Sequence, residues 1–200
     1  STTPFSLIGL ALGIFLGFRN NTSYDRFWEA RKLWGGVVNY ARSITRQIET
    51  LIAPEYTDEE RKALVYQTIA YVHCLRMHLR NEWKPQYLNN LLSEKQISYL
   101  TGQLNRPIGL LHLMGKGLQE LYQREAIHPQ HLPTLEHSLE QLTNLQGGCE
   151  RIKSTPIPFS YNILLHRIVA IYCFTLPFGL VSITGWLTPL VTTLVAYAFL

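Results

Sequence analysis

PFSLIGLALGIFLGF, residues 4–18, contains no charged side chain. At about 1.5 Å per residue, a helix of this length covers about two thirds of the ~30 Å hydrocarbon core of a bilayer. Beyond it, the only glycines or prolines before Pro54 are Gly35 and Gly36. We therefore expect one long helix that leaves the membrane after residue 18 and continues into water to about Leu51, with Pro54 ending it.

Charged residues are confined to the middle of the chain. The average composition is ordinary, with 46% hydrophobic and 16% charged residues, but residues 1–18 and 168–200 contain no Asp, Glu, Lys or Arg. Residues 162–183 are long enough for one bilayer crossing, in which Pro177 and Gly179 are expected to produce a kink that membrane helices tolerate. Residues 186–200 begin another crossing. The alternative is a buried hairpin in a large soluble core. Both chain ends are expected to be cut from a longer protein.

The distribution of basic residues predicts the orientation. Lys and Arg follow residue 18 and precede the stretch 162–183, whereas the turn at Thr184-Gly185 has none. The positive-inside rule places residues 19–160 in the cytoplasm. We expect a transmembrane helix at 1–18 that continues as a cytosolic helix to about 51, a cytosolic helical region at 52–160, and a transmembrane hairpin at 161–200. The net charge of +4 then reflects topology, and no nucleic-acid partner is expected.

The middle of the chain shows helix signals and no sustained strand alternation, so the predicted class is all-α. Capping boxes and a Pro near a helix start predict helices from Thr57 to about Leu79, from Ser93, from Asn105 to about Glu125, and from Thr134 to Leu145. The last of these is predicted to end at Gly147-Gly148.

Two four-residue repeats overlap in the first apolar stretch. They are Gly9, Gly13 and Gly17, and Leu10, Ile14 and Phe18. Small residues at this spacing allow membrane helices to pack closely. If several copies surround an axis, the bulky line forms apolar rings that can gate ion flow by dewetting. The alternative is a helix pair whose bulky residues face lipid.

The bulky line continues to Thr22 and Asp25. A ring of carboxylates below a pore neck would favour cations. The alternative is an exposed Asp25 paired with Arg26 or Lys32.

Other candidate sites carry less information. His128, His131 and His137 lack a carboxylate or Cys that would complete a metal site, so solvated histidines are expected and no metal or cofactor is. His166 and Arg167 begin a membrane stretch, where they line a functional path or extend to the interface. Three widely spaced cysteines are expected to be reduced: Cys74, Cys149 and Cys173. No motif of a catalytic site occurs, so an enzyme is not expected.

Several segments resemble the bacterial branch of the bestrophin family. They are FLGFRNN at residues 15–21, the groups SY, RF, EAR and LWG between residues 23 and 35, GGCER at 147–151, TPIPF at 155–159 and LPF at 176–178. The resemblance spans essentially the whole chain. It implies a homopentamer in the inner membrane with a single axial pore, through which monovalent ions pass passively. It also implies that the family's first transmembrane helix and its acidic C-terminal segment lie outside this sequence.

The resemblance assigns roles to individual residues. Leu10, Ile14 and Phe18 correspond to the hydrophobic neck of the family's pore. The family's second constriction, usually an aliphatic residue at the cytosolic exit, falls near Gln130, with Ile127 as the alternative. Animal bestrophins conduct anions and bacterial relatives include cation channels, so with Asp25 we expect monovalent cations such as sodium. The alternatives are a chloride channel of the same architecture and a membrane-anchored scaffold that does not conduct.

Overall fold

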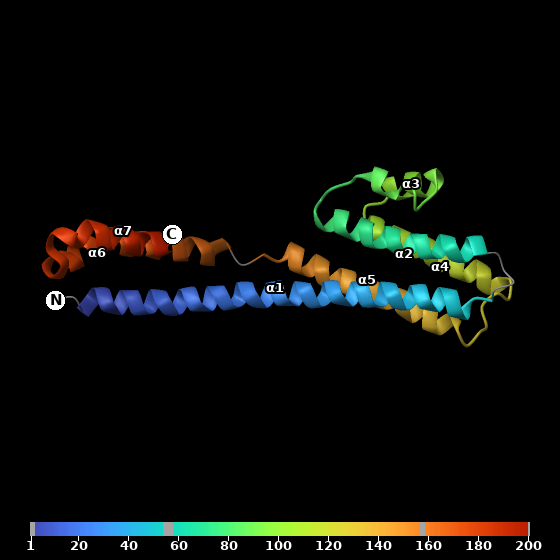
Figure 1. Cartoon of the computed structure of the whole chain (residues 1–200), viewed down its shortest axis with the longest axis horizontal. Helices are drawn as coiled ribbons and strands as arrows, with labels where there is room; N and C mark the ends of the chain where they lie inside the picture. Colours follow the sequence, from blue (N-terminus) through green and yellow to red (C-terminus); the bar gives the residue numbers. More distant parts are fainter. Residues whose placement is uncertain (1–2, 54–57, 157–158, 200) are drawn as a thin grey trace. The chain divides into compact units, whose positions relative to one another are not determined.

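The computed structural model describes residues 3–53, 58–156 and 159–199 (Figure 1). These residues are mainly helical, and no strand occurs among them, so the all-α prediction is confirmed. The chain divides into two compact units. Unit 1 comprises Ser1–Trp28 and Thr155–Leu200, and unit 2 comprises Glu29–Ser154.

The first helix, α1, runs from Thr3 to Leu51 without a break. It therefore ends at the residue expected from the sequence and passes through Gly35-Gly36. Pro54, expected to end it, and Thr57, the expected N-cap of the next helix, lie outside the described residues.

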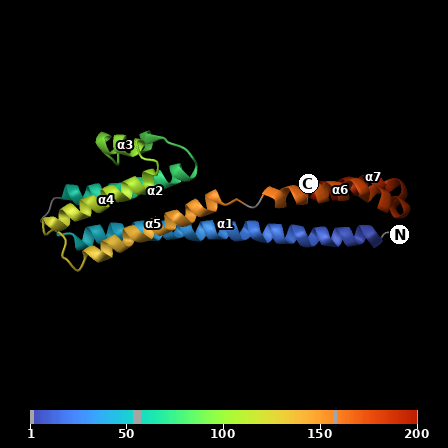
Figure 2. The same ribbon diagram turned by 180° about the vertical axis from the view of Figure 1, so that it is seen from behind.

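Unit 2 packs the second half of α1 with four α-helices and a short 3₁₀ helix. These elements are α2 (Asp58–Leu79), η1 (Pro85–Leu88), α3 (Glu94–Thr101), α4 (Arg106–Gln123) and α5 (Leu132–Ser154). Helix α2 lies along α4, and α4 packs against α5, as both views show (Figures 1 and 2). Their apolar faces share one core that includes Ile44, Tyr71 and Leu110, all with no exposed surface.

Local sequence signals set two of these helix starts. The Ser93 side chain accepts a hydrogen bond from the Gln96 N–H, while the Gln96 side chain accepts one from the Ser93 N–H, which completes the predicted capping box. The Asn105 side chain accepts from the Ile108 N–H at the start of α4. Both predicted starts are confirmed.

The predicted end of the helix expected from Thr134 to Leu145 is wrong. Helix α5 begins at Leu132 rather than Thr134 and continues through Gly147-Gly148 to Ser154. Gly148 lies inside α5 and packs closely against α1, because a Cβ there would lie 2.7 Å from Leu33 Cδ2. A glycine that permits close approach of two helices resembles a helix terminator in sequence.

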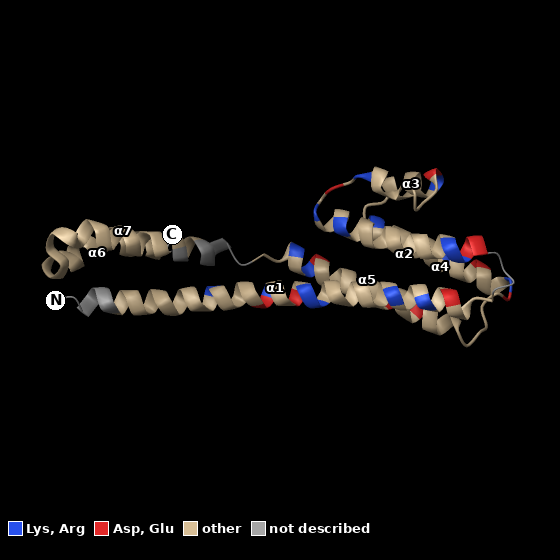
Figure 3. Ribbon diagram, in the orientation of Figure 1, with Lys and Arg blue, Asp and Glu red and all other residues tan. Residues whose placement is uncertain are grey.

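Unit 1 contains an apolar helical hairpin. Helix α6 (Phe159–Thr184) includes Pro177 in its interior and packs against α7 (Thr188–Phe199). The 3₁₀ turn between them starts at Gly185, whose φ of +53° favours glycine. Figure 3 shows Lys, Arg, Asp and Glu on α1 and in unit 2, whereas α7 is uncharged.

One stretch among the described residues, His166–Ala198, is long and apolar enough to cross a membrane by length and composition. It covers most of α6 and α7. The N-terminal stretch at 4–18 is not among the candidates found in this way.

Candidate functional site: an exposed apolar line on the first helix

Leu10, Ile14 and Phe18 lie on one face of α1 and are largely exposed, with 65%, 52% and 61% of their surfaces accessible. At about 100° per residue, this face is opposite the one that contains Gly9 and Leu12. Leu12 is 1% exposed, so the intramolecular packing of α1 in unit 1 uses the opposite face. The bulky line therefore has no packing role within the described part of unit 1.

The three glycines of the small-residue line differ in their surroundings. A Cβ at Gly9 would lie 3.0 Å from the Tyr172 hydroxyl oxygen on α6, so this glycine permits close helix packing within unit 1. At Gly13 and Gly17 a Cβ would meet no other described atom within 4 Å. Only Gly9 therefore has the predicted role in the described part of a single chain.

The polar residues after Phe18 are also on the surface. The Thr22 hydroxyl donates to the Phe18 carbonyl oxygen at 3.0 Å, so it is bonded within the helix. Asp25 is exposed. Arg26 donates to the Thr155 carbonyl oxygen at 2.5 Å.

The two candidates for the cytosolic exit have different environments in the loop between α4 and α5. Ile127 is 1% exposed, belongs to the core of unit 2, and forms an isolated antiparallel bridge with Ile52. Gln130 is exposed, and its N–H donates to His128 Nδ1 at 3.3 Å. Of the two, only Gln130 presents its side chain at the surface of unit 2.

The histidine candidates do not converge. The rings of His128 and His131 are 5.6 Å apart, whereas His137 Nδ1 lies 3.6 Å from a carboxylate oxygen of Glu140 on α5. No group of three or more His, Cys, Asp or Glu side chains that could hold a metal occurs in the described parts of the chain. The three cysteines are free thiols.

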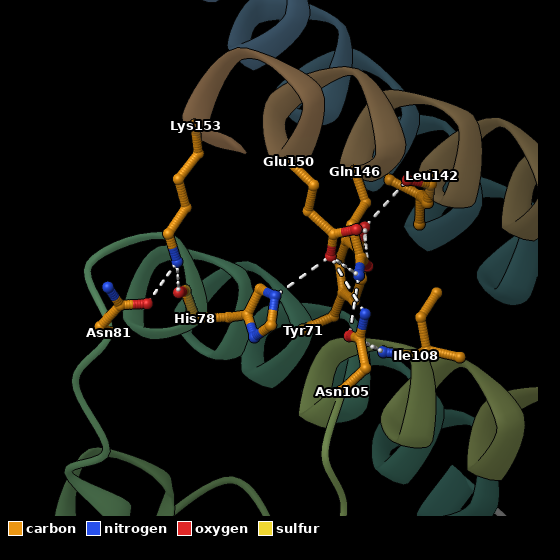
Figure 4. Close-up of polar contacts among 9 residues, drawn as sticks. All are labelled: Tyr71, His78, Asn81, Asn105, Ile108, Leu142, Gln146, Glu150 and Lys153. Carbon is orange, nitrogen blue, oxygen red and sulfur yellow. Dashed lines mark hydrogen bonds and ion pairs between the residues drawn. The ribbon is translucent and has the colours of Figure 1, made fainter. Parts of the chain in front are cut away.

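Sequence reasoning missed a buried polar network that joins α2, α4 and α5 (Figure 4). Gln146 lies at its centre, where its amide nitrogen donates to Asn105 Oδ1 at 2.9 Å and to Glu150 Oε1 at 2.7 Å. Asn105 donates to the same Glu150 oxygen at 3.1 Å, and His78 Nε2 lies 3.2 Å from it. One carboxylate therefore gathers groups from three helices.

Tyr71 completes this network from α2. Its hydroxyl, fully buried, donates to the Leu142 carbonyl oxygen at 2.9 Å (Figure 4). Burial, followed by the nearby Cys149 and Glu150, raises the pKa of Tyr71 above its usual value, so the phenol stays neutral. The GGCER segment thus contributes packing and polar contacts within unit 2. The only local signal for the network was Asn105, which the sequence marks solely as a helix cap.

A second polar contact joins the ends of α2 and α5. Lys153 Nζ donates to the His78 carbonyl oxygen at 2.7 Å and to Asn81 Oδ1 at 2.5 Å (Figure 4). Asn81 follows α2 with a φ of 55°, a conformation that Asn tolerates better than most residues. These bonds satisfy a carbonyl oxygen at the C-terminus of α2.

Comparison with known proteins gives a consistent result. The model of the bacterial/fungal bestrophin family matches residues 1–200. The chain is 42% identical over its whole length to a voltage-dependent anion channel-forming protein of Ralstonia nicotianae, of which it covers 65%. It is 36% identical over 98% of its length to a protein of the same description from Escherichia coli K12, of which it covers 64%. The chain thus spans just under two thirds of these relatives.

Solved structures show the same fold. A crystal structure of a bacterial bestrophin homologue from Klebsiella pneumoniae matches with a TM-score of 0.93 and 33% identity, covering all of this chain and 73% of that one. The fold and the apolar hairpin define an all-α protein of the helical membrane class. The chain belongs to the bacterial/fungal bestrophin family, and the predicted resemblance is confirmed.

Proposed function

We propose that this chain is part of a subunit of a homopentameric ion channel in the bacterial inner membrane. The subunit crosses the bilayer several times, with residues 19–160 in the cytoplasm, and the pentamer conducts monovalent ions passively through one axial pore. Family membership supports this proposal, as do the names of the relatives, which describe channel-forming proteins.

The observation that carries the proposal is the exposed line of Leu10, Ile14 and Phe18 on α1. These bulky side chains are on the face opposite the intramolecular packing of unit 1. In a ring of five copies that places this face on the axis, the line forms three apolar rings. A narrow apolar constriction resists wetting and can therefore gate ion flow.

For selectivity, the proposal is monovalent cations such as sodium, and the support for it is Asp25. Asp25 is exposed and follows Phe18 by seven residues, or about two turns of α1. Five copies of its carboxylate below the neck would attract cations and repel anions. Monovalent anions such as chloride are the second candidate, because the relatives are named anion channel-forming proteins.

For the cytosolic exit, the structure favours Gln130 over Ile127. Ile127 is buried in the core of unit 2 and would have to leave it to reach a pore, whereas Gln130 is exposed. An exit ring of amides is hydrated more easily than an aliphatic ring. We therefore place the main barrier to ion flow at the neck.

The test is the reversal potential of the full-length protein in planar bilayers under a salt gradient. A reversal potential near that of the cation supports the cation channel, and one near that of the anion supports the second candidate. A protein that assembles but never carries current would instead be a membrane-anchored interaction protein. A cross-linking ladder that stops at a species other than five would contradict the stoichiometry.

A further inference from the structure

The cytosolic part of α1 presents a basic face that points away from the core of unit 2. Arg42 and Arg46, one helical turn apart, are exposed, whereas Ile44 and Ile48 between and beyond them are fully buried. Neither guanidinium group forms a hydrogen bond or ion pair among those found for the described residues. Two cationic side chains one turn apart on a helix surface could form ion pairs with two carboxylates that have the same spacing.

A groove with an acidic α5 side lies elsewhere on unit 2, between α4 and α5. Its floor is apolar, with Leu111 and Leu139 only 7% and 6% exposed. Glu136 and Glu140, also one turn apart, line its α5 side, and both are exposed. The α4 side adds the cationic Lys116 together with His112.

The two surfaces cannot meet within one chain. Helix α5 contacts the face of α1 that includes Gly36 and Gln47, since Leu145 lies against Gly36 and the Ser138 hydroxyl donates to Gln47 Oε1 at 2.8 Å. At about 100° per residue, Arg42 and Arg46 project about 110° away from this face of α1. On α5, Glu136 and Glu140 lie on the side nearly opposite to Ser138 and Leu145, which face α1, so the groove points away from α1 of its own chain. A second copy of the chain is required to bring them to the groove.

We propose that the groove between α4 and α5 of one subunit receives the Arg42/Arg46 face of α1 from a neighbouring copy. The two arginines then pair with Glu136 and Glu140. Glu49, exposed one turn after Arg46, supplies a complement for Lys116. Both partners therefore carry the charge pattern that the other requires.

The two contacting surfaces differ, so the contact is heterologous, and repeated copies generate a ring when the rotation closes. This inference rests on the proposed ring assembly and names the surfaces that build its cytosolic part. The apolar floor supplies buried area, while the charges fix the orientation and register of the helix in the groove.

Charge reversal in the full-length protein tests the contact. Arg42→Glu with Arg46→Glu should shift the assembly in mild detergent toward smaller species, raising the dissociation concentration at least about tenfold if two charge-assisted contacts become repulsive. Glu136→Arg with Glu140→Arg should have the same effect. All four changes in one chain should restore the ring. The exposed pair on α3, changed as Glu94→Lys with Lys95→Glu, is the matched control and should leave assembly unchanged. Native mass spectrometry reads the result.

A second experiment remains informative if the reversed chains fold poorly, which circular dichroism would reveal. Chains with Arg46→Cys alone and with Glu136→Cys alone are mixed and oxidised, in a background without the native cysteines. A dimer that requires both variants supports the contact. The absence of such a dimer overturns it, as does an unchanged ring after either reversal or a fourfold variant that stays dissociated.

These outcomes are distinguishable from failure of the proposed channel function. A fourfold variant that reassembles without carrying current supports the contact and contradicts the channel. Rings that conduct normally after either reversal contradict the contact and leave the channel intact.

Discussion

Gly148 on α5 lies against the side chain of Leu33 on α1 so closely that a Cβ at Gly148 would stand 2.7 Å from Leu33 Cδ2 and 3.0 Å from Cδ1. The preceding residue, Gly147, is exposed, and a Cβ built there would have no other described atom within 4 Å. The two neighbours therefore provide an unusually direct comparison of a packed and an unpacked helix glycine.

We expect Gly148→Ala to lower the free energy of unfolding by about 1–3 kcal/mol, because the added methyl group overpacks the contact with Leu33. Thermal unfolding in detergent measures the change. Gly147→Ala is the matched control and should be neutral or stabilising by up to about 1 kcal/mol, because alanine favours a helix interior over glycine. Equal effects of the two substitutions would show that the α1–α5 contact is looser than the structure indicates.

Because of Cys74, we expect the free energy of unfolding to fall at alkaline pH. Its thiol is 1% exposed, and burial raises its pKa from 9.0 to about 12, despite the opposing effect of Arg106. The folded state therefore retains the proton where the unfolded state loses it. The stabilisation is complete below about pH 9 and falls as pH rises to about 12, by up to about 1.4 kcal/mol per pH unit.

Unfolding free energies measured across this pH range check the prediction. Cys74→Ala should show a flatter alkaline slope than the wild type, although its packing loss lowers stability at every pH. Cys173→Ala retains Cys74 and should keep the wild-type slope. Parallel slopes for wild type and Cys74→Ala would rule out this thiol as the source.

Local signals in the sequence predicted much of the helical framework because they act within one turn. The Ser93 capping box and the Asn105 cap are examples, and an uninterrupted run of helix-compatible residues sufficed for α1. The errors concern contacts between segments that are far apart in sequence. The sequence around Gly148 predicts a helix end, because its partner Leu33 is 115 positions away and local signals do not include it. The bridge between Ile127 and Ile52 is also a contact between distant segments, which local signals do not predict.

For the candidate site, too, local features could be predicted from the sequence, whereas contacts between distant segments could not. Periodicity placed Leu10, Ile14 and Phe18 on one face, since helix geometry alone determines that relationship. It could not decide whether that face meets lipid, a partner or a pore. The network around Gln146 could not be predicted, because its members come from three helices: the four-residue spacing of Leu142, Gln146 and Glu150 places them on one face of α5 but does not identify their partners on α2 and α4.

Truncation of the neck should increase current. Leu10→Ala, Ile14→Ala and Phe18→Ala each widen an apolar ring and ease its wetting, so each should raise conductance or open probability several-fold in planar bilayers. Ile171→Ala and Phe174→Ala on α6 are matched controls. Both are apolar and exposed, at 64% and 75%, but they lie on another helix.

The controls should conduct as the wild type does. Unchanged currents in all three α1 variants would remove the neck assignment while leaving family membership intact. Increased currents in the α6 variants as well would indicate a general loosening of the membrane part rather than a local gate.

Neutralising Asp25 should change selectivity. In the proposed pentamer, Asp25→Asn removes five carboxylates below the proposed neck, so a cation-selective reversal potential should move toward zero. Glu29→Gln is the matched control, because Glu29 lies one turn further along α1 and its carboxylate already pairs with Arg151 at 2.9 Å. An equal shift in both variants would point to the overall charge of this part of α1 instead of Asp25. No shift for Asp25→Asn would refute its role.

Substitutions at the two exit candidates should have different effects: those at Ile127 should change stability, and those at Gln130 should change conductance. Ile127→Ala empties a buried site in the core of unit 2 and should cost about 2–5 kcal/mol of unfolding free energy. Gln130→Ala alters an exposed side chain and should leave stability within about 0.5 kcal/mol of the wild type. In planar bilayers, Gln130→Leu should instead lower conductance, because an aliphatic ring wets less readily than a ring of amides. A stable Ile127→Ala channel with altered conductance, together with an unchanged conductance of Gln130→Leu, would identify Ile127 as the exit residue. The loop that contains Ile127 would then have to leave the core in the assembled protein.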